Sequence, residues 1–202
     1  PLRLVGSEMC IRDRNIYLSL SFQLEKNSQL NGFSLMVGLA IRDTLSELYD
    51  IDSKIKWPND IFFDHKKFCG VLIETKYENN VLKIVIGIGI NVFMHSNDQI
   101  DQDWTSLKLI DGEKSFDRNL IIGKLTSKIL DYSRTYEKYG FSHFQKPFNQ
   151  NNYLKNKILT SENFKGKDCK VKEVDEEGRL KVEINKEEKL ISSGELSFKI
   201  KE

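Results

Sequence analysis

The first clear pattern in the chain is a strict alternation of apolar and polar residues over positions 15–24. A period of two predicts a β-strand with one buried face. From Phe33 to Leu48, apolar residues instead recur at intervals of three and four, which predicts an amphipathic helix. Met36 lies on the apolar side of this helix, and we expect it to fill the core.

Four further apolar runs cover residues 54–57, 61–63, 69–77 and 81–93. All are rich in β-branched or aromatic residues and are separated by turn formers, so they predict successive strands. A tight hairpin is expected at residues 79–80, between the last two runs.

A second helix is predicted over residues 117–139, with Asp117 as its N-cap. Its expected inner face consists of Leu120, Ile121, Leu125, Ile129, Leu130 and Tyr136.

The chain changes character after Asn149. Residues 157–200 are rich in lysine and contain short alternating runs at 169–174 and 180–184. Turns are expected at 175–178 and 192–194. The pattern predicts an α+β fold in which a mixed, mainly antiparallel sheet with helices (15–150) is followed by a small β-barrel (151–202).

Composition excludes some classes of function. Positive and negative charges nearly balance, with a formal net charge of +1, so nothing favours binding to nucleic acid. No apolar run approaches the ~20 residues of a membrane helix. The three cysteines, Cys10, Cys69 and Cys169, are far apart, as expected for reduced thiols in a cytoplasmic protein.

The candidate chemistry lies in three short blocks. Lys56, Trp57, Pro58, Asn59 and Asp60 follow directly on a predicted strand. Lys67 and Gly70 come next, and Gly87, Ile88, Gly89, Ile90 and Asn91 complete the set. Glycine inside a strand suggests that a ligand or backbone approaches closely. Taken singly, each block also fits ordinary turn chemistry, a solvated lysine or a β-bulge, and physics alone does not name a reaction.

In order and spacing, these blocks resemble the signature motifs of biotin protein ligases. Residues 15–19, Trp104 with Thr105 and Leu107, and Asp117-Arg118-Asn119 also resemble segments of that family. The resemblance implies a class II synthetase-like catalytic domain followed by an SH3-like β-barrel. It also implies an ATP-dependent C–N ligase that forms biotinyl-5′-AMP and transfers biotin to a lysine of a biotin carboxyl carrier protein.

Carried over by position, the resemblance implies a role for each residue of the site. Lys67 would be the catalytic cation that meets the biotin carboxylate and the ATP α-phosphate. Gly70, Gly87 and Gly89 would form the surface under biotin. The positions implied near the nucleotide are Lys56, Asn59, Asp60, Asn91, Trp104 and Lys199, with Asp60 and Asn91 close to magnesium.

The same resemblance implies ATP, biotin and Mg²⁺ as small-molecule partners. Neither a protein-only metal site nor nucleic-acid or membrane binding is expected. A homodimer is a further possibility that the family suggests.

The start of the chain departs from the family. Ligases of this kind carry a glycine- and arginine-rich loop that closes over biotinyl-AMP, before the strand that begins here at Asn15. Residues 1–14 read differently and resemble a translated sequencing adaptor, so we expect them to be non-native. An N-terminally truncated ligase without its lid should show little ligation.

Two other functions stay open on the sequence alone. One is a lipoate ligase or acyl transferase of the same fold, and the other is a non-catalytic, biotin-responsive regulator.

Overall fold

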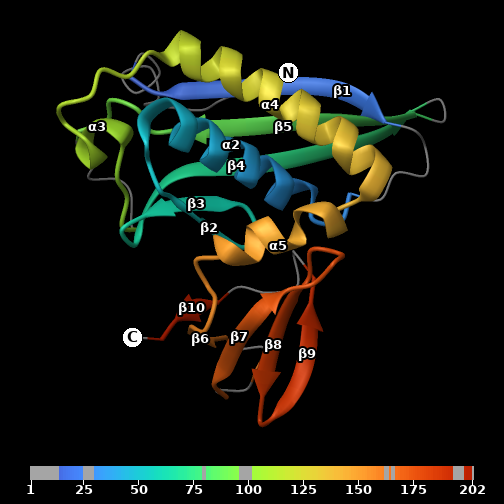
Figure 1. Cartoon of the computed structure of the whole chain (residues 1–202). Coiled ribbons are helices and arrows are strands. Elements are labelled where there is room, and N and C mark those ends of the chain that lie inside the picture. The colour runs from blue at the N-terminus through green and yellow to red at the C-terminus, as the bar shows by residue number, and fades with distance from the viewer. Residues whose placement is uncertain are drawn as a thin grey trace.

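Two antiparallel sheets with helices packed against them make up the computed structural model, which describes residues 14–24, 30–78, 81–95, 102–161, 164, 167–192 and 198–201 (Figure 1). The first sheet has the strand order β1-β5-β4-β3-β2. Its strands are β1 (Ile16–Leu24), β2 (Lys54–Lys56), β3 (Asp60–Phe63), β4 (Lys66–Glu78) and β5 (Val81–Ile90). The predicted α+β class with mainly antiparallel pairing is confirmed.

The two faces of the first sheet differ in polarity, as the period of two predicted. Along β5, every second side chain from Leu82 to Ile90 is buried, and Ile16 of β1 enters the same core. Helices α2 (Phe33–Tyr49) and α4 (Arg118–Tyr139) cover this face (Figure 1). The opposite face of β5 carries Gly87 and Gly89 and stays open.

The two predicted helices form, with one correction to their buried surface. Met36 is fully buried in α2, and Asp117 caps α4 by accepting hydrogen bonds from the backbone N–H groups of Asn119 and Leu120. Leu120 and Leu130, which we predicted on the inner face of α4, are 48% and 45% exposed. Each adjoins a buried residue in sequence, and one residue turns a helix by about 100°, so neither lies on the buried stripe. That stripe consists of Ile121, Leu125, Ile129, Ser133 and Tyr136.

Two short helices were not predicted. They are α3 (Leu107–Ile110) and α5 (Ser142–Gln150), and α5 contains Pro147. Phe144 and Phe148, one helical turn apart, fix α5 by burying their rings.

The second sheet has the order β10-β6-β7-β8-β9, all antiparallel. Its strands are β6 (Ile158–Thr160), β7 (Cys169–Val174), β8 (Leu180–Ile184), β9 (Glu187–Ile191) and β10 (Lys199–Ile200). The runs at 169–174 and 180–184 and the turn between them are as predicted. Among the described strands, none closes the sheet by pairing β9 with β10, so the barrel stays a prediction. The predicted turn at 79–80 and residues 193–194 of the turn predicted at 192–194 lie outside the described residues.

Backbone and side-chain hydrogen bonds join the two sheets. Residues 151–153 run beside β2, where Ile55 N–H donates to the Asn151 carbonyl and Tyr153 N–H donates to the Ile55 carbonyl. The Asn149 side chain of α5 both donates to and accepts from the backbone of Val174 in β7. The second sheet is therefore fastened to the first through β2 and α5.

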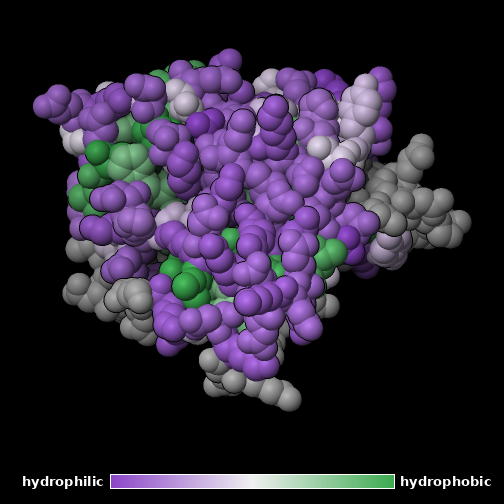
Figure 2. Space-filling view, turned by 60° about the horizontal axis from the view of Figure 1, so that its bottom comes forward, coloured by the Kyte–Doolittle hydropathy of each residue, from purple (hydrophilic) through white to green (hydrophobic). Residues whose placement is uncertain are grey.

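Seen from the end that carries the second sheet, the coloured surface is mainly hydrophilic, and its hydrophobic side chains form small separate groups (Figure 2). Within the part of the chain that the structure describes, no helix combines the length and the apolar character needed to cross a membrane.

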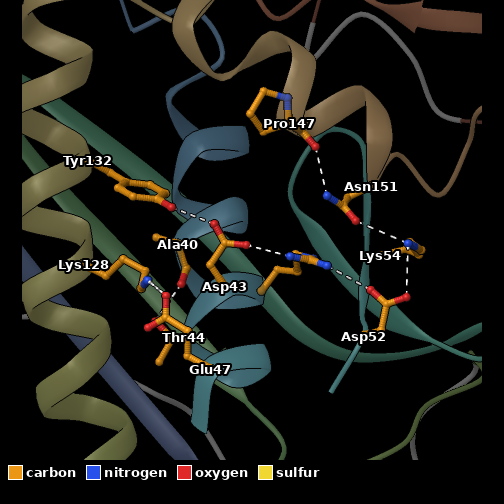
Figure 3. A network of polar contacts seen from close by, with 11 residues as sticks. Ala40, Asp43, Thr44, Glu47, Asp52, Lys54, Lys128, Tyr132, Pro147 and Asn151 are labelled. Carbon is orange, nitrogen blue, oxygen red and sulfur yellow. Dashed lines mark hydrogen bonds and ion pairs between the residues drawn. The ribbon is translucent and has the colours of Figure 1, made fainter. Parts of the chain in front are cut away.

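A chain of polar contacts ties α4, α2, β2 and α5 together on the helix-covered side of the first sheet (Figure 3). It begins at Tyr132 of α4, whose hydroxyl donates to Asp43 of α2 at 2.7 Å. Arg42 bridges Asp43 and Asp52, at 2.8 and 3.0 Å. The chain continues from Asp52 through Lys54 and Asn151 to the Pro147 carbonyl of α5. Burial, assisted by the hydrogen bond to Asp43, raises the pKa of Tyr132 well above its usual value, so this hydroxyl keeps its proton.

We predict that Tyr132→Phe lowers the free energy of unfolding by about 1 kcal/mol, because it removes one hydrogen bond to a carboxylate while keeping the ring. Urea denaturation of both proteins measures the difference. Tyr139→Phe is the matched control, since Tyr139 lies on the same helix with half its side chain exposed and should leave stability unchanged. Equal losses in the two variants would contradict a role for the Tyr132–Asp43 bond.

Candidate functional site

An open cavity of about 1400 Å³ lies on the open face and along the β1 edge of the first sheet. Its walls come from β1, from the start of β3, from β4 and β5, and from the segment that leads into α4. The residues lining it are Asn15, Ile16, Tyr17, Leu18, Ser19, Asn59, Asp60, Lys67, Gly70, Val71, Leu72, Gly87, Ile88, Gly89, Ser115, Phe116, Asp117, Arg118, Asn119 and Ile122. The cavity thus joins segments that are far apart in the sequence.

The strand register brings the predicted glycines together. Gly89 of β5 is paired with Tyr17 on one side and with Gly70 of β4 on the other, and Gly70 is paired with Asp60 of β3. Paired residues on neighbouring strands share a face. A row from Tyr17 through two glycines to Asp60 therefore crosses the open face.

Space above these glycines is not filled by the protein itself. A Cβ added at Gly87 would come no closer than 3.6 Å to Leu72, and one at Gly89 would be 3.9 Å from Tyr17. At Gly70 it would be 3.4 Å from Asp60 Oδ1 and 3.5 Å from Lys67 Nζ. None of these contacts forbids a side chain. The glycines keep a shallow floor open, which suits a flat ligand.

Lys67 reaches this floor because β4 contains a bulge. The predicted strands at 61–63 and 69–77 left Lys67 in the connection between them, but the observed strand begins earlier. The turn is Asp64 and His65, both at positive φ, and Lys67 is the second residue of β4. The register shifts after Ile61, so that Cys69 is paired with Ile61 but Lys67 with Phe62.

The bulge decides which face Lys67 occupies. Phe68 and Cys69 are 1% and 2% exposed, so two consecutive side chains enter the core. Lys67 then emerges on the same face as Gly70, where strict alternation would have pointed it to the other side. Its ammonium forms an ion pair with Asp60 Oδ1 at 2.7 Å.

Backbone contacts on the other edge of β4 hold Lys67 in place. Its N–H donates to the Asp103 carbonyl at 3.0 Å, and its carbonyl accepts from Thr105 N–H at 2.9 Å. Only about a quarter of the Lys67 side chain and a fifth of the Asp60 side chain are exposed. The ammonium is thus oriented before any ligand arrives, with its partner carboxylate at the edge of the floor.

Asn59 is fixed to the neighbouring strand. Its side-chain amide donates to the Val71 carbonyl at 2.8 Å, and its own carbonyl accepts from Val71 N–H at 2.9 Å. Lys67, Asn59 and the three glycines therefore converge on one cavity, as the sequence led us to expect.

Four other predicted residues do not line the cavity. Asn91 donates its side-chain amide to the Thr105 carbonyl at 3.1 Å. The backbone of Trp104 pairs with Lys67 in a short parallel bridge. Lys199 is exposed in β10 of the second sheet. Lys56 is half-buried, with its ammonium 4.9 Å from the centre of the Phe62 ring.

The segment leading into α4 contributes residues that we did not select as site residues. Arg118 lines the cavity and donates to the Asn15 carbonyl at 3.3 Å. The Asn15 side chain is buried and accepts from Val92 N–H at 3.0 Å. Lys67 and Arg118 are the two cations among the described lining residues. Asp117 is occupied as the helix cap, and the Asp117-Arg118-Asn119 block was the only signal in the sequence for this wall.

Chemically, the site offers a flat floor of glycines with an oriented ammonium at one end and a guanidinium on the wall. Such a cavity fits a small molecule that is mostly apolar and carries an anionic group. In the described residues, no group of three acidic, histidine or cysteine side chains gathers as a metal site.

The fold is similar to that of solved biotin protein ligases. The sequence model of the biotin/lipoate A/B protein ligase family matches residues 8–91. The structural likeness covers 92% of this chain.

Two bacterial relatives carry the name bifunctional ligase/repressor BirA. The protein from Salmonella typhimurium is 33% identical over 134 residues, which cover 64% of this chain and 41% of the relative. That from Bacillus subtilis is 34% identical over 132 residues, covering 63% and 39%. A solved structure of the biotin protein ligase from Aquifex aeolicus in complex with biotin and ATP has a TM-score of 0.77 and 28% identity, covering 92% of this chain and 79% of that one.

These aligned regions span about two fifths of the length of the BirA relatives. The family match begins at residue 8, inside the segment that we expected to be non-native. Residues 1–13 lie outside the described residues, so that expectation stays a prediction.

The desolvation of Lys56 can be tested by measuring how protein stability changes with pH. Burial is the main cause that lowers the pKa of the Lys56 ammonium. The charge of Asp60 opposes this shift, and the charges of Lys67 and Lys157 add to it. Between this lowered pKa and the unfolded value near 10.5, the unfolded chain holds more protons than the folded chain. Stability from this residue therefore rises as the pH rises through that window.

We predict that wild-type protein gains stability relative to Lys56→Met when chemical denaturation is moved from pH 7 to pH 10. Lys66→Met is the control for removal of a charge at an exposed site. If the difference between wild type and Lys56→Met does not change with pH, Lys56 is not desolvated as described.

Proposed function

We propose that the chain carries the catalytic domain and the small domain that follows it in an ATP-dependent biotin protein ligase. The observation that carries the proposal is the Lys67 ammonium, held by Asp60 beside a floor of three glycines in one cavity. The Aquifex aeolicus relative is described in complex with biotin and ATP, which supports these two substrates here.

Biotin would lie on Gly70, Gly87 and Gly89, since its fused rings need a surface without side chains. Its carboxylate would point to Lys67. Two anions, the carboxylate and the ATP α-phosphate, must approach each other for reaction. An oriented ammonium between them offsets their repulsion and the charge that develops during transfer.

The reaction would have two steps. A carboxylate oxygen of biotin attacks the α-phosphorus, a new P–O bond forms, the α–β phosphoanhydride bond breaks, and pyrophosphate leaves. A lysine amine of the carrier protein then attacks the acyl carbon of biotinyl-5′-AMP. The amide bond forms, the acyl C–O bond breaks, AMP leaves, and the amine proton passes to solvent.

The remaining residues would serve the nucleotide. Asn59 and Asp60 adjoin Lys67 at the cavity edge, and we propose that they contact ATP. The cavity is not lined by Asn91, Trp104, Lys56 or Lys199. The resemblance to biotin protein ligases implies that they lie near the nucleotide, and we propose them as additional nucleotide contacts. Magnesium would neutralise the polyphosphate when bound with ATP, and Asp60 is a carboxylate that could hold it.

Further features of the proposal follow the family. The acceptor would be a biotin carboxyl carrier protein, residues 15–150 would be the catalytic domain, and residues 151–202 would be an SH3-like barrel. A homodimer and a cytoplasmic location are also proposed. The second sheet, joined to β2 and α5, supports a C-terminal domain that works with the catalytic one.

The first test concerns Lys67. We predict that Lys67→Met lowers the rate of biotin-dependent exchange of pyrophosphate into ATP by about 10²- to 10³-fold, the usual cost of losing one group that stabilises transition-state charge. This exchange reports the first step alone, even where biotinyl-AMP escapes before transfer. Lys66→Met removes the neighbouring, exposed ammonium and should leave the rate unchanged. Equal rates for Lys67→Met and wild type would rule out the proposed role.

The second test concerns the floor. We predict that Gly89→Val abolishes biotin binding by calorimetry while the protein stays folded, because the added side chain has room in the free cavity but would occupy the ligand's place. Gly123→Val in α4 is the control, since a Cβ there meets nothing within 4 Å. If Gly89→Val binds biotin as tightly as the wild-type protein does, biotin does not lie on the glycine floor. Tighter binding of lipoate than of biotin by wild-type protein would instead assign the chain to the lipoate branch.

A further inference from the structure

The turn at residues 57–59, here called the ligand turn, precedes Asp60 and is held from three sides. The indole N–H of Trp57 donates to the Gly178 carbonyl of the second sheet at 3.0 Å. Ser34 of α2 donates its hydroxyl to the Pro58 carbonyl, also at 3.0 Å. On the third side lie the two bonds between Asn59 and Val71. Each residue of the ligand turn is thus anchored to a different element.

The anchor in the second sheet is itself stiff. Gly178 lies in the turn between β7 and β8, here called the supporting turn (residues 175–179). Asp175 Oδ1 accepts from the backbone N–H groups of Glu177 and Arg179, at 3.0 and 2.9 Å. Asp175 Oδ2 forms an ion pair with Arg179 at 2.7 Å. The carbonyl that receives the Trp57 indole is therefore presented by a turn with little freedom.

The backbone of the supporting turn is in close contact with the backbone at the start of α2. A Cβ at Gly178 would lie 2.4 Å from the Gly32 Cα and 2.6 Å from the Gly32 nitrogen. Gly178 also has a φ of +77°, which glycine adopts far more easily than other residues. Because Gly32 is the N-cap of α2, the supporting turn sits directly on the start of that helix.

Trp57 fills the space between these parts. It is 1% exposed, and its ring stacks near that of Phe198 with centroids 6.3 Å apart. A buried indole N–H needs its partner, because an unpaired donor in the core is costly. Displacement of the supporting turn would therefore draw Trp57, and with it Asn59 and Asp60, away from Lys67.

We infer that Trp57 and Gly178 are positioning residues: the second sheet, through its supporting turn, sets the place of Asn59 and Asp60 and thereby the direction of the Lys67 ammonium. Through this link the second sheet would act on the first chemical step although neither Trp57 nor Gly178 touches the substrates. The kinetic part of this inference rests on the proposed function, whereas the structural coupling does not.

The experiment compares two glycine variants at positions with positive φ. Gly178→Ala places a Cβ against the backbone of Gly32. Gly140→Ala places one at a similar φ of +65° with nothing within 4 Å. We expect exchange of the Val71 amide hydrogen, measured by NMR, to be at least about tenfold faster in Gly178→Ala than in Gly140→Ala. Amides of the central strand β5 serve as the reference for global stability and should differ much less.

The kinetic readout separates position from folding. After correction for the folded fraction, Gly178→Ala should lower kcat for biotin-dependent pyrophosphate exchange at least about tenfold, since small misplacements of reacting groups cost that much. The KM for biotin should change less than about twofold, because the glycine floor is untouched. A merely structural role would lower only the amount of folded protein.

Trp57→Phe is the second variant, used to decide the matter if Gly178→Ala does not fold. It keeps an aromatic ring and removes the N–H donor, so exchange at Val71 should rise about fivefold. Exchange at Val71 that is unchanged in the folded variants, relative to β5, would overturn the inference. Wild-type protein without exchange activity would count against the proposed function alone, and the amide measurements would still decide the coupling.

Discussion

In β4, two consecutive side chains, Phe68 and Cys69, enter the core, although a regular strand would send only one of them there. This one extra residue brings Lys67 out on the open face of the sheet. The ion pair with Asp60 follows from it, since both groups then stand beside Gly70. Without the bulge, the cavity would keep its glycine floor but would have no ammonium beside it.

The floor and the cation are stabilised in different ways. Gly70, Gly87 and Gly89 lie in strands paired on both sides, so the central sheet alone fixes them. Lys67 depends on elements outside the sheet, namely the residues around Trp104 on one edge of β4 and the ligand turn on the other. The ligand turn depends in turn on α2 and on the second sheet. The binding surface therefore depends on the central sheet alone, whereas the position of the reactive ammonium also depends on α2 and on the second sheet.

Much of the fold could be predicted because burial follows simple periods. The strand at 15–24, the helix from Phe33 and the runs at 169–174 and 180–184 appear as alternation or helical spacing dictates. The predictions failed where the burial of a residue departs from the regular period of the helix or strand. Leu130 is apolar but lies a single step around the helix from Ile129, and the short helix α5 was not predicted.

The candidate site was predicted in part for the same reason. Asn59, Lys67 and the glycines were found from their spacing, but plain alternation puts Lys67 on the wrong face, and no pattern reveals a bulge. Arg118 was not selected as a site residue, because its place in the cavity comes from tertiary packing of α4 beside β1. The link from Trp57 to Gly178 joins positions far apart in the chain, so only the folded protein shows it.

The hairpin between β3 and β4 has one further consequence. Its turn is only Asp64 and His65, both in the left-handed region, so the loop cannot absorb a change in chain length. Loss of a single codon at Asp64 or His65 would shift the two-residue turn by one position, pair Lys67 with Phe63, cancel the bulge and turn the lysine side chain toward the core. Mutational tolerance here should therefore be asymmetric, because many exchanges of side chain preserve which face each residue occupies, whereas a deletion inverts it.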